Sequence, residues 1–182
     1  MDIRIQRTKI KITDTLEVML KTKELKNITV LELCQEANIN RTTFYKYYND
    51  IDDLVNKIEV ELISEIEKEI ESINRNYLLT YTSKLLERVS KDNSIIRALI
   101  SSNGDHKFLR LILSKVKKQS IEEWQKLLKK ADENDLNNIY NFIIDGSIGI
   151  INSWVNKKCK EDPKNISLFI NKICMSGLSS FI

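Results

Sequence analysis

The side chains with the clearest chemical character lie together in one short run, residues 41–47. The run supplies one guanidinium, one ammonium group and four hydroxyl groups, and its members are Arg41, Thr42, Thr43, Tyr45, Lys46 and Tyr47. Such groups donate hydrogen bonds or carry positive charge, and phosphate oxygens and the edges of bases accept both. The run therefore predicts a surface that binds a nucleic acid.

Other kinds of chemistry have little support in the sequence. His106 is the only histidine, no CxxC motif exists, and no Ser/His/Asp or Cys/His set, phosphate loop or paired-carboxylate site is recognisable. Cys34, Cys159 and Cys174 are far apart and odd in number, which is typical of reduced thiols in a cytoplasmic protein. We therefore expect no catalytic site, no metal and no cofactor, and turnover of a substrate would overturn this interpretation.

Two short helices joined by a tight turn are predicted to hold the run in place. The first helix has an apolar stripe at helical spacing, formed by Val30, Leu33, Cys34 and Ala37. Thr29 and Glu32 have capping-box spacing at its start, and Asn38 stands where the chain must turn through a left-handed conformation. Asn40 can then cap a second helix over residues 41–47. This pattern predicts a helix-turn-helix, whose second helix enters the major groove of DNA.

The rest of the chain favours an all-α fold, because glycine and proline are scarce and β-branched residues recur at helical spacing. We expect an N-terminal three-helix DNA-binding domain over residues 1–52 and a C-terminal helical ligand-binding and dimerisation domain over residues 53–182. Asp50 can cap a long helix that links the two, and Asp162 with Pro163 starts the last one. The remaining helices are predicted over 8–21, 77–91, 92–101, 106–130, 134–157 and 163–180, with loops around Asn103 and Gly104 and at 160–162.

Charge is unevenly distributed although the formal net charge is only +3. The first thirteen residues hold one acid, Asp2, against four basic residues, and residues 59–71 hold six glutamates. A basic end beside an acidic helix suits a protein that docks to phosphate with one end, although both segments are equally compatible with ordinary solvated helix faces. The charged N-terminus predicts no signal peptide, and no apolar run is long enough to span a bilayer, so we expect a cytoplasmic protein.

The predicted helix over 134–157 is apolar over a wide arc with small residues at its middle, Gly146, Ser147 and Gly149. Such an arc needs cover on more than one side, and small residues allow a helix or a ligand to approach closely. One solution is that the last two helices pair with their copies in a second subunit, through Ile144, Ile148, Ile151, Trp154, Phe169 and Ile173. The alternative is that they are covered by helices of the same chain.

Residues 8–60 resemble the DNA-binding domain of TetR-family transcriptional regulators. The family pattern is matched by Thr29-Val30 and then by the run ANINRTTFYKYYNDIDDL, residues 37–54. Asn38 stands where the family has glycine, Tyr48 where it usually has phenylalanine, and Ile51 where it usually has a lysine that contacts phosphate. Residues 140–178 look like the C-terminal helix pair of a subgroup that includes regulators of dihydroxyacetone use.

The resemblance implies a homodimer that binds a palindromic operator in double-stranded DNA and is released by a small-molecule effector, with repression as the common mode. Arg41 and Thr42 would reach base edges, and Tyr45 and Tyr47 would bind the backbone, as in relatives. The full set of expected DNA contacts is Thr29, Arg41, Thr42, Thr43, Tyr45, Lys46 and Tyr47. Tyr45 and Tyr48 could instead be core residues, and we favour the core for Phe44 and Tyr48. Lys46 could be only a solvated surface residue.

The effector cannot be named from the sequence. Aromatic residues beyond the head are candidates for the lining of its pocket, although aromatic residues on helical faces more often belong to a plain core. The candidates are Tyr81, Phe108, Trp124, Tyr140 and Phe142. An alternative function is a co-regulator of the same fold that acts mainly through a protein partner. The absence of the phosphate-contacting lysine at Ile51 is the feature that points to it.

Overall fold

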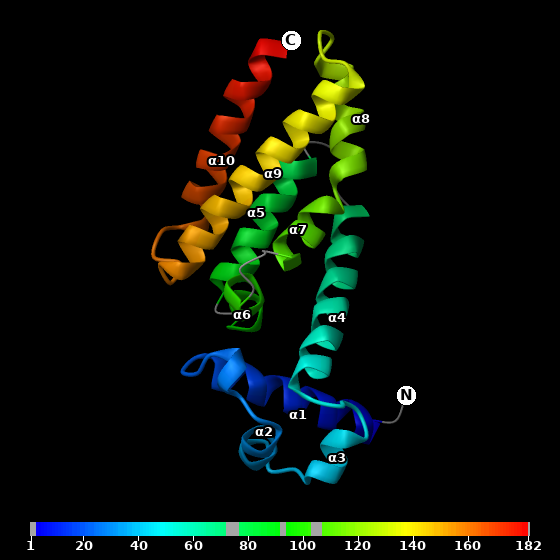
Figure 1. The fold of residues 1–182 in the computed structure, drawn as a ribbon, viewed down its shortest axis with the longest axis vertical. Coiled ribbons are helices and arrows are strands. Elements are labelled where there is room, and N and C mark those ends of the chain that lie inside the picture. Colours follow the sequence, from blue (N-terminus) through cyan, green and yellow to red (C-terminus); the bar gives the residue numbers. More distant parts are fainter. Residues whose placement is uncertain (1–2, 72–76, 92–93, 103–106, 182) are drawn as a thin grey trace.

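The computed structural model describes residues 3–71, 77–91, 94–102 and 107–181. Throughout these residues the regular elements are helices, which confirms the predicted all-α class. Figure 1 shows a small helical head at one end of the molecule and a larger helical body at the other. The predicted loop at Asn103 and Gly104, together with His106, lies outside the described residues.

The head consists of α1 (Ile3–Leu20), α2 (Val30–Glu36) and α3 (Arg41–Tyr45), with a short 3-10 turn, η1 (Leu25–Asn27), before α2. Each helix turns an apolar side toward a common centre, where four side chains have no exposed surface: Ile12, Leu16, Leu33 and Phe44. Because α3 is only five residues long, its position depends on this packing rather than on its own helical stability.

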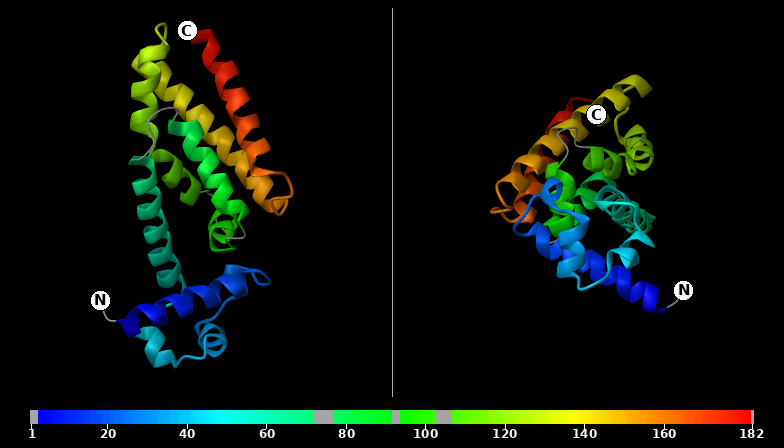
Figure 2. Two further views of the ribbon diagram at one scale, coloured as in Figure 1. Left: turned by 180° about the vertical axis from the view of Figure 1, so that it is seen from behind. Right: turned by 60° about the horizontal axis from the view of Figure 1, so that its bottom comes forward.

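The long helix α4 (Ile51–Glu71) leads from the head to the body, as Figure 1 and the left view of Figure 2 show. Its buried residues include Leu54 and Ile58 in the first half and Ile63 and Ile66 in the second. The predicted division between residues 52 and 53 lies in the first turn of this helix, and it remains a prediction.

The body is a bundle of six α-helices and one terminal 3-10 turn within the described residues, built around one apolar core. The longest of them, α9, crosses the middle of the bundle and α10 runs back beside it (Figure 1). Their bounds are α5 (Tyr77–Ser90), α6 (Ser94–Ser102), α7 (Lys107–Ser114), α8 (Lys117–Leu127), α9 (Glu133–Asn156), α10 (Pro163–Leu178) and η2 (Ser179–Phe181). Among the described residues, no helix combines the length and apolar character that a membrane crossing requires.

Polar contacts join the head and α4 to the body. The hydroxyl of Ser94 in α6 donates to the carbonyl oxygen of Glu17 in α1 at 2.8 Å. At the other end of α4, the guanidinium of Arg88 in α5 pairs with Glu65 and Glu69. The ammonium of Lys115, between α7 and α8, lies 2.7 Å from the carboxylate of Glu67. These contacts connect α4 and α1 to the body through polar as well as apolar groups.

The predicted helix boundaries are wrong in three places. Helix α1 begins five residues before the predicted Thr8, and α3 ends two residues before Tyr47. The predicted helix over 106–130 is two helices, because the chain bends at Lys115 and Val116. There the amides bond to the carbonyls three residues earlier, those of Ile112 and Leu113, instead of four residues earlier as in an α-helix. The bend buries Val116 completely, and neither glycine nor proline marks it in the sequence.

Candidate nucleic-acid interface

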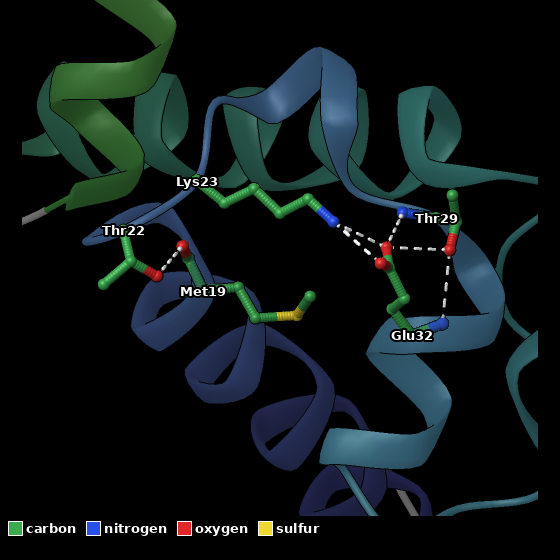
Figure 3. A network of polar contacts seen from close by, with 5 residues as sticks. All are labelled: Met19, Thr22, Lys23, Thr29 and Glu32. Atoms are coloured by element: carbon green, nitrogen blue, oxygen red, sulfur yellow. Dashed lines mark hydrogen bonds and ion pairs between the residues drawn. The ribbon is translucent and has the colours of Figure 1, made fainter.

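The start of α2 is fixed by a network of side chains that Figure 3 shows from close by. The amide of Glu32 donates to the Thr29 hydroxyl at 3.3 Å, and the amide of Thr29 donates to the Glu32 carboxylate at 3.2 Å. This confirms the predicted capping box. The ammonium of Lys23 lies 2.8 Å from the same carboxylate, and these bonds, Lys23 first, lower the pKa of Glu32. The network ties the start of α2 to the loop after α1.

The turn between α2 and α3 has the backbone that the sequence predicts. Asn38 has φ of 45°, in the left-handed region, and its amide donates to the carbonyl of Gln35 at 3.0 Å. The side chain of Asn40 then caps α3 by accepting a bond from the amide of Thr42 at 2.9 Å. The turn therefore ends the first helix and starts the second within four residues, 37–40.

The predicted DNA-binding run is presented on the outer side of α3 and the turn that follows it. Arg41, Thr42, Tyr45 and Lys46 are exposed, as is Thr29 at the start of α2, whereas Thr43 and Tyr47 are half-buried. Phe44 is fully buried and Tyr48 is 6% exposed, so both are core residues, as predicted. The structure thus gathers the expected contact residues around one end of the head, on and beside its shortest helix.

Arg41 and Tyr45 contact each other on this surface. A terminal nitrogen of the Arg41 guanidinium donates to the Tyr45 hydroxyl at 3.3 Å, and the guanidinium carbon is 5.7 Å from the centre of the tyrosine ring. The hydrogen bond with Tyr45 raises the pKa of Arg41. The Tyr45 ring in turn meets the buried ring of Phe44 edge-on, with centroids 5.7 Å apart.

The end of α3 is held by Lys57, a residue that the sequence reasoning missed. Its ammonium donates to the backbone carbonyl of Tyr47 at 2.8 Å and to the Asp53 carboxylate at 3.0 Å, and it lies 5.3 Å from the Tyr48 ring centre. The amide of Asn49 donates to the same carboxylate at 2.8 Å and, with Lys57, lowers the pKa of Asp53. The i,i+4 spacing of Asp53 and Lys57 was the available signal.

The basic N-terminal helix reaches the same surface. The ammonium of Lys9 in α1 lies 5.9 Å from the centre of the Tyr47 ring. Both views in Figure 2 place the N-terminal end of α1 next to α3. Positive charge from α1 therefore stands beside the hydrogen-bonding groups that follow α3.

The first turn of α4 has the opposite charge. Ile51 is only 9% exposed and belongs to the core, so this position cannot offer a charged group to phosphate. Asp50 caps the helix by accepting a bond from the amide of Asp53 at 2.7 Å, and Asp52 follows it in the same turn. Three carboxylates at this helix start disfavour a phosphate there.

In the body, four of the five predicted pocket residues are buried, and some buried polar atoms there have no hydrogen-bond partner among the described residues. Tyr81, Phe108, Trp124 and Tyr140 are each at most 8% exposed. The Tyr140 hydroxyl donates to the Leu113 carbonyl at 2.6 Å. The hydroxyl of Tyr81 is buried and, in the part of the chain that the structure describes, has no hydrogen-bond partner; the same holds for Gln119 Oε1 and Ser120 Oγ of α8. Burial also raises the pKa of Tyr81.

Phe142, the fifth predicted pocket residue, lies apart from the other four. It is 77% exposed, and it lies on the outer side of α9 rather than toward Tyr81 and Tyr140. There it lines an apolar groove of about 460 Å³ between α9 and α10. The other residues of this outer groove are Asn138, Ile139, Ile143, Gly146, Ser147, Ile150, Ile170, Ile173, Cys174, Gly177, Leu178 and Phe181.

The predicted dimer residues divide into two groups. Ile144, Ile148, Ile151 and Trp154 are at most 3% exposed, because other helices of the same chain cover this side of α9. They offer almost no surface to a second subunit, and the structure contradicts the prediction for these four. Phe169 and Ile173 of α10 are 54% and 46% exposed and remain available.

The three cysteines are free thiols, with Cys34 and Cys174 buried and Cys159 half-buried. Burial raises the pKa of each. Across residues 3–71, 77–91, 94–102 and 107–181, no group of three or more histidine, cysteine or acidic side chains is placed to hold a metal ion.

Among the solved structures of similar fold are three regulators. The dihydroxyacetone kinase operon activator DhaS is 17% identical, with a TM-score of 0.72, covering 96% of this chain and 97% of its own. The fatty acid degradation regulator FadR from Bacillus halodurans is 17% identical, with a TM-score of 0.73 and coverage of 94% and 96%. FadR from Bacillus subtilis, solved with stearoyl-CoA, is 17% identical, with a TM-score of 0.68 and coverage of 92% and 98%.

No curated protein matches this sequence. A family profile does: residues 76–176, more than half of the chain, match the TetR profile described as "Transcriptional regulator C-terminal region". This match lies in the body, so it is independent of the resemblance of residues 8–60, which lie in the head and the first half of α4. The chain belongs to the TetR family of transcriptional regulators.

Proposed function

We propose that this protein is a ligand-responsive repressor that binds a palindromic operator as a homodimer and is released by a small-molecule effector. The observation that carries the proposal is the exposed surface of α3, where Arg41, Thr42, Tyr45 and Lys46 stand on a helix anchored by buried Phe44. A short helix with donors outward and an aromatic anchor inward is suited to the major groove.

Each residue of this surface has a role that fits its position. Arg41 and Thr42 occupy the first turn of α3, from which side chains reach base edges, and arginine can pair bidentately with guanine. Tyr47, Thr43 and Lys46 would contact phosphates or thymine methyl groups. Thr29 would offer a phosphate its hydroxyl at the start of α2. Lys9, beside Tyr47, would compensate for the lysine that Ile51 replaces.

The outer groove between α9 and α10 is the proposed dimer interface, with a second copy of the chain as its occupant. Its lining is almost entirely apolar, and Phe142, Phe169 and Ile173 project beside it with about half or more of their surface exposed. A Cβ built on Gly146 or Gly149 meets no atom within 4 Å, so a helix of the second copy can approach α9 closely. TetR-family regulators act as dimers, which supports this occupant.

The proposed effector site lies in the body core between α5, α8 and α9. An unpaired buried polar group costs about 1–3 kcal/mol, so the hydroxyls of Tyr81 and Ser120 and the amide oxygen of Gln119 favour a ligand that supplies partners. Their surroundings include Trp124 and Tyr140, whose ring centroids are 6.1 Å apart. We infer a neutral effector with an apolar body and one hydrogen-bonding group. The binding of stearoyl-CoA by the Bacillus subtilis FadR agrees with an apolar body.

Effector binding would reach the head through contacts that the structure contains. A shift of α5 or of the bend between α7 and α8 moves Arg88 and Lys115, which hold the far half of α4 through its glutamates. Lys57 then connects the near half of α4 to the carbonyl of Tyr47. A differential affinity of about 1–3 kcal/mol for the two arrangements is enough for such coupling.

The alternative function, a co-regulator that works through a protein partner, is favoured by one observation. The start of α4, where relatives use lysine on phosphate, presents buried Ile51 and three carboxylates. Weak, sequence-independent DNA binding by the purified protein would support this alternative.

Fluorescence anisotropy of the purified protein on its own upstream DNA and on a scrambled duplex, over a salt series, tests the proposal. We expect preference for the native fragment and a steep dependence on salt. Arg41→Ala should abolish the preference. Lys129→Ala removes the same charge from an exposed site in the body and is the matched control, which should bind like the wild type. Equal binding of all three proteins to both duplexes would refute the proposal.

A further inference from the structure

Arg41 and Tyr45 stand one turn apart on α3 and are bonded to each other, guanidinium to hydroxyl, at 3.3 Å. We propose that Tyr45 is a positioning residue for Arg41, which fixes the direction of the guanidinium and so determines the base that Arg41 selects. The inference rests on the proposed DNA-binding function. It assigns Tyr45 a role in specificity rather than a separate contact with the backbone.

The tyrosine is able to position the arginine because it is itself held by the core. Its ring packs edge-on against Phe44, which has no exposed surface, and Phe44 also meets the ring of Tyr48 at 5.4 Å. A succession of contacts therefore runs from the core of the head through an aromatic ring to an exposed guanidinium. An exposed arginine without such support samples many rotamers, and binding must order them.

The direction of the hydrogen bond leaves the pair with useful chemistry. The Tyr45 oxygen accepts from Arg41, so the hydroxyl proton remains available to donate to an acceptor on DNA. The arginine uses one terminal nitrogen for this bond and keeps other N–H groups for a bidentate contact with guanine. Exclusion of water from the groove strengthens the bond between the two residues, because the local dielectric constant falls.

A separate role for Tyr45 gives a different result in mutants. If Tyr45 bound only a phosphate, removal of its hydroxyl would weaken binding to all duplexes alike, and this loss of affinity would add to the loss caused by Arg41→Ala. If Tyr45 positions Arg41, the hydroxyl matters only while the arginine is present. Tyr45→Phe is the informative substitution, because it keeps the ring that packs on Phe44. Tyr47→Phe is the matched control, since no bond joins that hydroxyl to Arg41 among the described contacts.

The test is a double-mutant cycle on a duplex that the wild type selects from a randomised pool. Tyr45→Phe should weaken binding by about 3- to 30-fold in the wild-type background and by less than about 2-fold in the Arg41→Ala background. Tyr47→Phe should have the same effect in both backgrounds. Single base-pair changes in the duplex should reveal one position at which Arg41→Ala removes the base preference of the wild type. Tyr45→Phe should reduce the base preference at that position and at no other.

A second measurement examines the pair without DNA. In the free protein, ¹⁵N relaxation of the Arg41 Nε–H group should show less order after Tyr45→Phe and no change after Tyr47→Phe. Additive effects in the cycle with unchanged base preference, or unchanged Arg41 order, would overturn the inference. If the wild type selects no duplex, the proposed function fails, while the relaxation measurement still decides whether Tyr45 orders Arg41.

Discussion

Ile173→Glu should dissociate the homodimer, and the structure gives the size of the effect. Ile173 lines the outer groove and is 46% exposed in the subunit. Complete burial of an isoleucine side chain is worth about 1.5–3 kcal/mol, so burial of its exposed half in the dimer contributes about 1 kcal/mol. A two-fold interface contains the residue twice, which makes about 2 kcal/mol for the pair.

The glutamate adds the cost of removing two carboxylates from water at an apolar interface, which is at least another 2 kcal/mol. The total of about 4 kcal/mol corresponds to a dissociation constant raised about a thousandfold. Sedimentation velocity over a concentration series measures this directly. Thermal unfolding should show an intact fold, because the side chain is half in solvent in the subunit.

Leu168→Glu is the matched control for this experiment. Leu168 is a 64% exposed apolar residue of the same helix, and it does not line the outer groove. Its variant should stay dimeric at concentrations where Ile173→Glu is monomeric. A dimeric Ile173→Glu protein, or dissociation by Leu168→Glu alone, would refute the assignment of the interface.

Three further predictions concern the head and the body core. Phe44→Ala should lower the free energy of unfolding by about 3–5 kcal/mol in chemical denaturation, because it empties the centre of the head, whereas Val60→Ala, at a 66% exposed site on α4, should change it by less than about 0.5 kcal/mol. The pKa of Asp53 is lowered in the fold, so the ionised carboxylate stabilises the turn after α3 when the pH is above the ordinary pKa of an aspartate. That contribution is lost as pH falls through the lower folded pKa, and hydrogen exchange of the Asn49 amide at acidic pH should detect the opening. Tyr81→Phe removes a buried hydroxyl without a partner among the described residues, so the free protein should be as stable or more stable while effector-induced release from DNA is weakened; a loss of stability in thermal unfolding would contradict the proposed site.

The local chemistry of the head could be predicted from the sequence because short-range rules govern it. A threonine three residues before a glutamate makes a capping box in most helical contexts, and it does so at Thr29 and Glu32. The left-handed backbone of Asn38 and the cap at Asn40 follow from the chemistry of asparagine in the same way. These few residues determine where α2 ends and α3 begins, and so which side chains face outward.

The body was harder to predict because periodicity does not say what covers an apolar side. Ile148 and Phe169 are both apolar, yet the first is 2% and the second 54% exposed, because the rest of the chain covers the first almost completely and the second only in part. The bend at Val116 has no glycine or proline to mark it, and packing on both sides decides it. The direction of a long side chain also cannot be predicted from the sequence pattern. The spacing of Asp53 and Lys57 predicts an ion pair between them, but it does not predict the bond from Lys57 to the carbonyl of Tyr47.

The central claim is that the surface of α3 reads a two-fold symmetric DNA sequence, and selection from a randomised duplex pool tests it most directly. We predict enrichment of an inverted repeat whose half-sites are about 10–10.5 base pairs apart, centre to centre, or a multiple of that spacing, because two recognition helices of a dimer meet successive major grooves. Arg41→Ala should lose this enrichment while Lys129→Ala keeps it. Enrichment of no sequence by the wild type, or of a single site without inverted symmetry, would contradict the account.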